Sequence, residues 1–362
     1  MKDIRNKNRK SFGKRHRLYI MKRNSFKKNF FKKKQRKTRI ISKANKIKSL
    51  IKVLFIIILS IFVYIFSKEK ETEEYIFGLP LEQKMLDYES KKFAIIRRTD
   101  CPECGLFSFQ IVYLGCVNKY LSEGYIPILD LQYYKNRYNS YEISSYNPWE
   151  LFFYQPYNYT MEEVQKYAKN KQYFACNSNV RRPNQIEIFF DINSINYWGN
   201  LTKKYIPVKH EIVKDAEIIM NHLFGKSKNI LGVKIRGTDY LRRPGGHPVQ
   251  PKTEQVISDV KTYDEKYKYE YIFFTSEDEN IKRKFVPEFK DKIKLLNLGD
   301  SYMRNFTNKN YQHLNFEKNY ILNVIILSRC LDLLTSKCNG VVGAIFFSKG
   351  FRNTFFYNLG VY

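Results

Sequence analysis

The second half of the chain alternates apolar strands with amphipathic helices, and this alternation limits the possible folds more than any other feature. From about residue 208 the pattern predicts strands over 230–235, 271–275, 293–296 and 331–334, and helices over 209–223, 253–263, 316–330 and 341–347. Strands that alternate with helices form parallel sheets with helices on both faces. We therefore expect a doubly wound domain over residues 208–362.

The first half opens in a similar way. We expect a strand over 93–98, a tight glycine turn at Gly105, a helix over 109–121 and a strand over 125–129. Such a β–turn–α–β start is typical of a Rossmann-like unit, here over residues 93–207. The aromatic run 146–156 is expected to pack as core, with a substrate platform as the alternative. A strand over 186–192 and a loop over 196–207 complete this half.

The extreme N-terminus is strongly basic. Residues 1–50 hold 21 Lys and Arg against one acid, Asp3, so they carry +20 of the chain's net charge of +29. Such a run stays solvated, and a nuclear-localisation or RNA-binding tail is one interpretation of it. The segment that follows argues against a nucleic-acid partner, because it is long and apolar.

Residues 53–67 carry no charge over 15 positions, and a snorkelling Lys52 extends the apolar segment. A spanning helix needs roughly 20 residues, so a membrane anchor over 51–67 is expected. A signal-peptide core or a buried helix are the alternatives. The following flank, 68–74, holds four Glu against two Lys. The positive-inside rule then places 1–50 in the cytosol and everything after a stem (68–92) across the membrane.

The cysteines and the glycosylation sequons fit a lumenal domain. All six cysteines follow the apolar segment, and exported domains permit disulfides. The spacing of Cys101 and Cys104 resembles half of a zinc site, but no second pair at zinc spacing exists. Three Asn-X-Ser/Thr sequons lie at Asn158, Asn200 and Asn305. We expect a single-pass type II protein of the Golgi or ER membrane.

A charged strand end is the strongest candidate site. The strand over 230–235 delivers Arg236 to its carboxyl end, which is where ligands bind in open α/β sheets. A fixed guanidinium suits a diphosphate. An ordinary surface arginine is the alternative. His247, in the basic loop beyond, could act as an acid or base, although a structural loop histidine would look the same.

Two further patterns could serve a nucleotide ligand. Asn339-Gly340 is a small-residue turn that opens a helix, whose free N–H groups suit phosphate oxygens. The acidic run 277–279 could hold a metal, contact a ribose or complement a helix dipole. Gly105 marks a turn where a ligand could approach the backbone.

These segments resemble, in order and spacing, one group of fucosyltransferases: the α1,6, nodulation and protein O-fucosyl enzymes. The matching stretches are Gly232–Asp239, His247-Pro248, Thr275–Asp278, Leu327–Arg329 and Ser336–Gly340, with weaker matches near 105–108, 124–127 and 147–150. The resemblance covers roughly residues 93–362. It implies a GT-B fold, in which two Rossmann-like domains with parallel sheets face a cleft. It also implies a GDP-sugar as co-substrate, with no metal or other cofactor.

The resemblance assigns roles residue by residue. Arg236 stands where the group has its phosphate-binding arginine, and Asp239 and His247 complete the catalytic candidates. Asn339 and Gly340 stand in the phosphate-binding turn, and Asp278 falls on the acidic pair after the strand. With Gly105, these residues form the expected donor site.

The chain departs from the group at several positions. Lys234 replaces a guanine-contacting histidine, Gly237 replaces the second arginine of the α1,6 enzymes, and Asn323 replaces a base-contacting carboxylate. The group's catalytic glutamate has no counterpart within 240–246. Lys234 and Asn323 are kept among the donor-binding candidates.

The expected function is a membrane-anchored, inverting, metal-independent fucosyltransferase. It would move fucose from GDP-fucose to a glycan or glycoprotein. One alternative is a metal-dependent transferase that uses residues 277–279 and another nucleotide sugar. The other is a nucleotide- or glycan-binding protein without catalysis.

Overall fold

The structure is a computed structural model that describes residues 19–21, 88–139, 145–183, 187–237, 245, 247–297, 305 and 309–362. The expected anchor (51–67) lies outside these residues, as do the expected tail (1–50) except residues 19–21 and the expected stem (68–92) except residues 88–92. Within the described part of the chain, no helix has the length and apolar character needed to cross a membrane. The chain forms two compact units: residues 1–21, 103–115 and 181–362 make unit 1, and residues 22–102 and 116–180 make unit 2.

Unit 1 is built on a sheet in the order β1-β9-β8-β5-β6-β7. Its strands are β1 (Tyr19–Met21), β5 (Ile230–Lys234), β6 (Tyr271–Thr275), β7 (Ile293–Lys294), β8 (Asp332–Ser336) and β9 (Asn353–Tyr357). Neighbouring strands are parallel except β1, which pairs with β9 in the antiparallel sense. The alternation in the sequence is therefore confirmed as an α/β fold.

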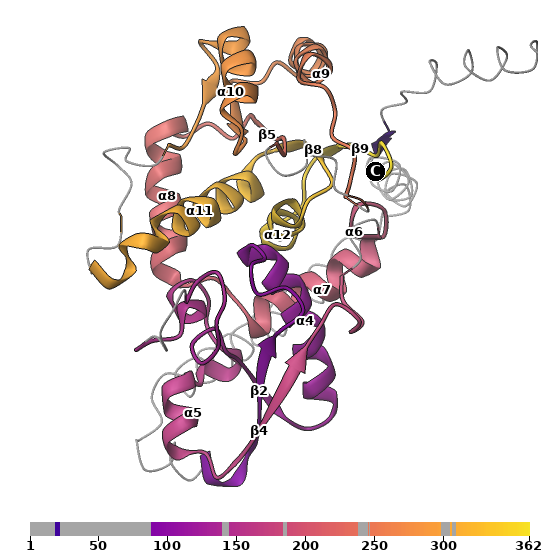
Figure 1. Cartoon of the computed structure of the whole chain (residues 1–362). Coiled ribbons are helices and arrows are strands. Elements are labelled where there is room, and N and C mark those ends of the chain that lie inside the picture. The colour runs from indigo at the N-terminus through magenta and orange to yellow at the C-terminus, as the bar shows by residue number, and fades with distance from the viewer. Residues whose placement is uncertain are drawn as a thin grey trace, which may run out of the picture. The chain divides into compact units, whose positions relative to one another are not determined.

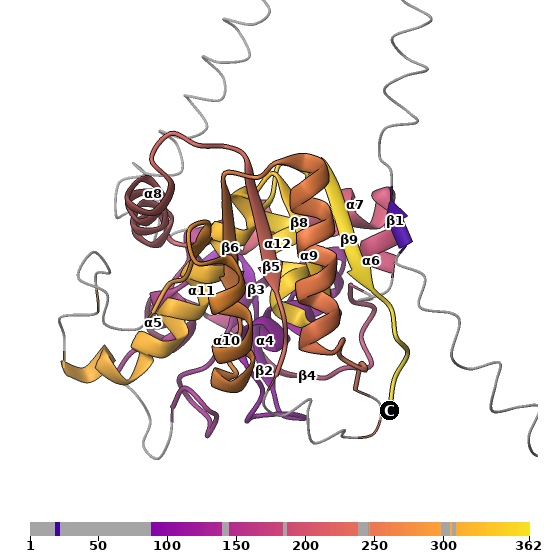
Figure 2. The same cartoon turned by 90° about the horizontal axis from the view of Figure 1, so that it is seen from above.

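The helices of unit 1 cover both faces of this sheet. They are α6 (Glu187–Phe190), α7 (Ile192–Tyr205), α8 (His210–Phe224), α9 (Thr253–Tyr267), α10 (Glu279–Phe285), α11 (Asn315–Arg329) and α12 (Asn339–Phe347), with the first part of α4 (Leu106–Ser122) and short 3-10 turns at Val286–Phe289 and Lys309–Leu314. Figures 1 and 2 show α9 and α10 on one face of the sheet and α11 and α12 on the other.

The side-chain alternation of β5 explains this arrangement. Leu231 and Val233 belong to the apolar cluster that also contains Val256 and Val260 of α9. Gly232 points to the opposite face, where an added Cβ would lie 3.1 Å from the nearest atoms of α11 and the adjoining Cys330. Glycine thus allows a close approach of α11. The side chain of Lys234 lies on the same face of β5 as Gly232, toward α11.

The strand order creates a switch point at β5 and β8. From β5 the chain proceeds through β6 to β7 on one side, and then returns to β8 and β9 on the other. At such a point the carboxyl ends of two adjacent strands are free of crossover connections, and ligands of open α/β sheets bind there. Arg236 follows β5 and Asn339 follows β8, so the two predicted phosphate-binding segments flank the switch.

Unit 2 has a three-stranded parallel sheet in the order β3-β2-β4. It contains β2 (Lys92–Arg98), β3 (Ile126–Leu129) and β4 (Asn170–Cys176), α5 (Met161–Tyr167), the second part of α4, and 3-10 turns at Pro148–Leu151 and Pro156–Asn158. Phe93 and Ile95 of β2 pack against Met161 and Val164 of α5. Trp149, Phe152 and Phe153 are fully buried, which confirms the aromatic run as core.

Four of the six cysteines form disulfides. Cys116 on α4 bonds to Cys176 at the end of β4, and Cys101 and Cys104 are disulfide-bonded as well. The expectation that disulfides form is confirmed. Cys330 and Cys338 are free and buried.

Several expected elements are wrong. Within the expected strand over 186–192, residues 187–190 form α6 instead, and α7 occupies most of the expected loop over 196–207. Asp191 begins α7, since its carboxylate accepts hydrogen bonds from the N–H groups of Asn193 and Ser194. Unit 1 also includes residues 181–207, which we expected in the N-terminal domain. The strand β4 and the helix α5 were not predicted.

Candidate functional site

One carboxylate joins the two cations at the end of β5. The Nζ atom of Lys234 lies 2.6 Å from Oε1 of Glu277, and Nη1 of Arg236 lies 3.2 Å from the same oxygen. Glu277 follows β6, which is the parallel neighbour of β5. The carboxyl ends of two adjacent strands therefore bring these three side chains together.

The burial of this cluster decides its charge state. The Lys234 side chain is 1% exposed, Glu277 17% and Arg236 23%. Burial alone would raise the pKa of Glu277, but the positive charges of Lys234 and Arg236 outweigh it and lower that pKa below its usual value. Glu277 is thus ionised at neutral pH. The end of β5 therefore carries a buried group of opposite charges in which Glu277 holds both cations in place.

Tyr320 of α11 connects this cluster to the start of α12. Its ring centroid lies 5.2 Å from the Lys234 Nζ atom, and the ring of Phe107 meets it edge-on at 5.4 Å. The Tyr320 hydroxyl occupies the place where a Cβ on Gly340 would stand. Gly340 is therefore required by the close approach of Tyr320, and this approach places the α12 N-terminus beside Lys234.

Asp278 contacts the loop after β5 and also caps helix α10. Its Oδ1 atom accepts hydrogen bonds from the N–H groups of Asn280 at 2.8 Å and Ile281 at 3.2 Å, so it caps α10. The N-cap of α10 is thus Asp278, and the N-cap of α9 is Lys252. A Cβ on Gly237 would overlap the Asp278 side chain.

The remaining predicted site residues lie in different settings. Asn323 is buried in α11, one turn after Tyr320, and its amide N–H groups donate to the carbonyl and side-chain oxygens of Asn319 at 2.9 and 2.6 Å. Gly105 precedes α4, and its carbonyl accepts from the N–H groups of Ser108 and Phe109 at 2.8 and 3.2 Å. An added Cβ on Gly105 would meet no atom within 4 Å.

The two other catalytic candidates are not part of the cluster as described. His247 is exposed, and its carbonyl accepts a hydrogen bond from the N–H of Tyr362 at 3.0 Å, which places it beside the C-terminus. Asp239 lies outside the described residues. The structure thus brings together Lys234, Arg236 and, through Tyr320, Gly340.

Sequence reasoning missed two members of the site. Glu277 was interpreted as a metal ligand or a helix-dipole partner, although its position after β6 was a usable signal for an ion pair with Arg236. No sequence pattern identified Tyr320, because its contacts depend on how α11 crosses the sheet. The three carboxylates of 277–279 have different partners. Glu277 pairs with Lys234 and Arg236, Asp278 caps α10, and Glu279 pairs with Lys282 at 2.6 Å. Among the described residues, no group of three or more His, Cys, Asp or Glu is arranged to hold a metal.

These features define a class of protein. A doubly wound parallel sheet carries an arginine fixed by a carboxylate on one side of its switch point and a helix N-terminus on the other. Both groups favour a phosphate-bearing ligand. The sheet edge of unit 1 therefore carries two groups that attract anions.

Comparison with known proteins leads to fucosyltransferases. No family description and no curated protein matches the chain. It is similar to a solved structure of NodZ alpha-1,6-fucosyltransferase soaked with GDP-fucose, at 13% identity and a TM-score of 0.42, over 72% of this chain and 93% of that one. NodZ from Bradyrhizobium matches at 13% identity and a TM-score of 0.39, over 68% and 89% of the two chains. POFUT1 in complex with GDP-fucose matches at 11% identity and a TM-score of 0.44, over 75% and 99%.

The names of these neighbours fall within the group of enzymes that the motifs resemble, and all three TM-scores lie below 0.5.

Proposed function

We propose that unit 1 binds the diphosphate of a nucleotide sugar and that the protein is a glycosyltransferase. The observation that supports this most directly is the position of Arg236 after β5 and of the α12 N-terminus after the adjacent strand β8. Glu277 keeps the guanidinium in place, and both a guanidinium and the N–H groups of a helix N-terminus suit phosphate oxygens. The motif resemblance adds the finer parts of the proposal: GDP-fucose as donor, a GT-B arrangement and inversion at the sugar.

The proposed reaction requires the protein to stabilise the leaving group and to provide a base for the acceptor proton. An acceptor hydroxyl oxygen attacks the anomeric carbon and forms the new glycosidic bond. The bond from that carbon to the diphosphate breaks, and its electron pair leaves with the nucleoside diphosphate. Arg236 and the N–H groups of α12 would stabilise the charge that develops on this leaving group. The hydroxyl proton passes to a base, for which Asp239 and His247 are the candidates.

Two alternatives have different support. A metal-dependent transferase would need residues 277–279 to turn toward one ion, whereas Glu277 pairs with Lys234 and Arg236, and Asp278 caps α10. A nucleotide-binding protein without catalysis agrees with the missing counterpart of the group's catalytic glutamate. The second alternative predicts tight binding of GDP and no transfer.

The experiment measures thermal unfolding and turnover of the full-length protein in detergent. We expect GDP to stabilise it by about 2.7 kcal/mol at a hundred times the dissociation constant. Arg236→Ala should abolish both this stabilisation and GDP release from GDP-fucose in the presence of acceptor. EDTA should change neither. Arg283→Ala removes an exposed arginine of α10 as a control. Unchanged turnover in Arg236→Ala would refute the proposal.

The cellular location is a separate proposal. The charge bias around 51–67 supports a single-pass anchor of the Golgi or ER with residues 93–362 in the lumen. A glycan or glycoprotein acceptor would be available there. The pairing of β1 with β9 counts against it, because a single crossing at 51–67 would put residues 19–21 and β9 on opposite sides.

A further inference from the structure

A second arginine, in unit 2, is held in a fixed orientation at the carboxyl end of β2. The Nε atom of Arg97 donates to Oδ2 of Asp130 at 2.6 Å, and Asp130 is completely buried. Asp130 is itself fixed, since its Oδ1 atom accepts from the N–H groups of Gln132 and Tyr133 at 2.7 and 3.0 Å. Within the described chain, Nη1 and Nη2 of Arg97 have no hydrogen-bond partner. The outer fork of the guanidinium is therefore oriented and available.

An exposed tyrosine lies beside this arginine. The Arg97 guanidinium carbon stands 4.7 Å from the ring centroid of Tyr173 on β4. Tyr173 pairs in register with Ile95, so it shares the face of the sheet that carries Arg97. Gln165 of α5 is within hydrogen-bond distance of the Tyr173 hydroxyl, with its amide nitrogen at 2.9 Å. Although both contacts fix the ring, 51% of Tyr173 remains exposed.

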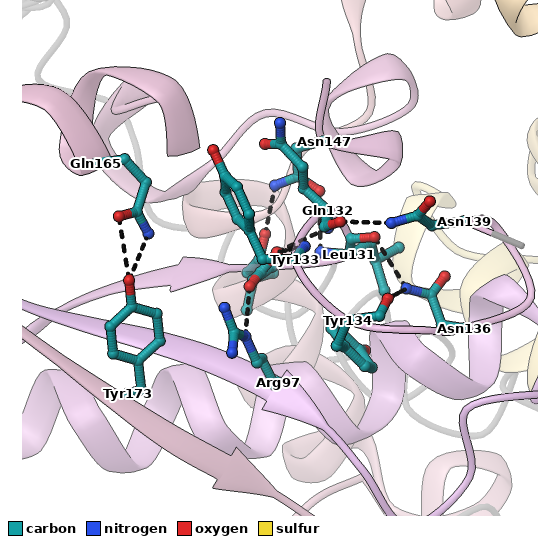
Figure 3. Close-up of polar contacts among 12 residues, drawn as sticks. Arg97, Leu131, Gln132, Tyr133, Tyr134, Asn136, Asn139, Asn147, Gln165 and Tyr173 are labelled. Carbon is teal, nitrogen blue, oxygen red and sulfur yellow. Dashed lines mark hydrogen bonds and ion pairs between the residues drawn. The ribbon is translucent and has the colours of Figure 1, made fainter. Parts of the chain in front are cut away.

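The hydroxyl of Tyr133 is a further polar group close to Arg97 and Tyr173. Figure 3 shows Gln165 and Tyr173 at the left of the close-up, and Tyr133 and Arg97 near its centre. In the part of the chain that the structure describes, the Tyr133 hydroxyl has no hydrogen-bond partner. Burial raises the pKa of Tyr133, and the charge of Asp130 raises it further. Tyr133 is thus a neutral phenol that can donate a hydrogen bond.

The local charge decides which ligand this group of residues suits. Asp130 already neutralises Arg97 at 2.6 Å. Glu162 of α5 adds a negative charge that acts on Tyr133. Lys171 of β4, whose Nζ atom donates to the Gln165 carbonyl at 2.6 Å, offsets that charge. The group therefore carries no net positive charge, and a carboxylate, sulfate or phosphate would gain no net attraction. A neutral ligand with adjacent hydroxyl groups fits better, because a guanidinium fork can donate to two oxygens at once.

An exposed aromatic ring beside a fixed donor fork suits a sugar. The C–H groups on one face of a pyranose pack on an aromatic ring, while hydroxyl groups at its edge take hydrogen bonds. We propose that Arg97, Tyr133 and Tyr173 form a subsite for an uncharged sugar unit of a glycan. Tyr173 provides the packing surface, Arg97 donates to two neighbouring hydroxyl groups, and Tyr133 provides a further hydrogen bond. The subsite lies wholly in unit 2 and does not depend on the proposed donor site.

The test uses full-length protein in detergent and saturation-transfer NMR. The probes are chitotetraose, mannotetraose, cellotetraose and maltotetraose, with tetragalacturonate as the acidic comparison. At least one neutral tetrasaccharide should bind, and tetragalacturonate should bind more weakly. Tyr173→Ala should weaken the neutral ligand about tenfold, which corresponds to about 1.4 kcal/mol. Tyr173→Phe should stay within about twofold, because the ring remains.

Two further variants separate binding from folding. Arg97→Lys keeps a positive charge for Asp130 but removes the fork, and we expect a loss of about tenfold as well. Tyr157→Ala removes a tyrosine that is 52% exposed elsewhere in unit 2, and it should leave binding unchanged. The proposal fails if no neutral probe binds, if Tyr173→Ala binds like wild type, or if tetragalacturonate binds more tightly. GDP stabilisation is measured on the same preparations, so a failure of the sugar subsite can be distinguished from a failure of the proposed donor site.

Discussion

Glu277 holds two cations with one oxygen, and its second oxygen is buried with no hydrogen-bond partner among the described residues. Lys234 is the most deeply buried member of this cluster. Without Glu277 the buried Lys234 side chain would lose the carboxylate that its Nζ atom contacts at 2.6 Å. Removal of one member of a buried pair costs far more than the pair itself contributes.

Glu277→Gln should therefore lower the free energy of unfolding by about 1–3 kcal/mol at pH 7. The folded-state pKa of Glu277 is depressed, so its contribution is complete above the usual value of 4.5 and is lost as the pH falls through the folded pKa. The difference between wild type and variant should shrink below pH 4.5. Urea denaturation between pH 3 and 7 measures it.

An exposed pair with the same spacing provides the control. Lys261 and Glu288 are also 2.6 Å apart, but their side chains are 50% and 41% exposed. Glu288→Gln should change stability by no more than about 0.5 kcal/mol. Equal effects of the two substitutions would contradict the view that burial gives Glu277 its role.

Gly340 gives a second prediction at this scale. Gly340→Ala places a methyl group on the Tyr320 hydroxyl and should destabilise the protein by about 1–3 kcal/mol. Tyr320→Phe removes that hydroxyl, so the double variant should recover part of the loss. A double-mutant cycle of unfolding free energies tests this. Strict additivity of the two changes would be inconsistent with the close approach.

At the scale of elements, the disulfide between α4 and β4 is the main link inside unit 2. Cys116 and Cys176 are 60 residues apart in sequence. Closure of a loop of this length stabilises the folded state by about 4 kcal/mol in the chain-entropy model. The bond ties the edge strand β4 to a helix, in addition to the parallel pairing of that strand with β2.

Replacement of both Cys116 and Cys176 by Ser should lower the unfolding free energy by about 2–4 kcal/mol. A reducing agent should weaken the wild-type protein by a similar amount. The same agent applied to the double variant reports only on Cys101 and Cys104, which serves as the control. Insensitivity of the wild-type protein to reduction would show that the bond does not stabilise unit 2.

The order of elements could be predicted from sequence where burial is complete. Strand β5 is entirely buried, and its uninterrupted apolar run located both the strand and Arg236. Strand β4 was missed because most of its residues are exposed, so Asn170–Cys176 shows no clear apolar alternation. Helix α7 was missed because Asn and Ser dominate its start. The Glu277 ion pair and the Tyr320 contact depend on strand adjacency and helix crossing, which one sequence does not contain.

At the scale of the whole molecule, the pairing of β1 with β9 and the proposed anchor imply different membrane topologies. The pairing joins residues 19–21 to unit 1. A single crossing at 51–67 would separate them.

The anchor proposal predicts that, in sealed microsomes, added protease removes an N-terminal tag and leaves a C-terminal tag protected. Endoglycosidase should then shift the mass of the protein, since Asn200 and Asn305 are exposed sequon residues. Protection of both tags, or digestion of both, would favour the β1–β9 pairing and refute the single crossing. Asn200→Gln with Asn305→Gln controls for the glycan shift.

The contact between Gly237 and Asp278 restricts how this protein can change over evolution. An arginine at position 237, as in the α1,6 enzymes, cannot be accommodated while the Asp278 side chain occupies that space. Loss of Asp278 first would remove the cap of α10. A descendant with two adjacent arginines would therefore have to acquire paired mutations, and laboratory selection for that motif should recover changes at both positions together.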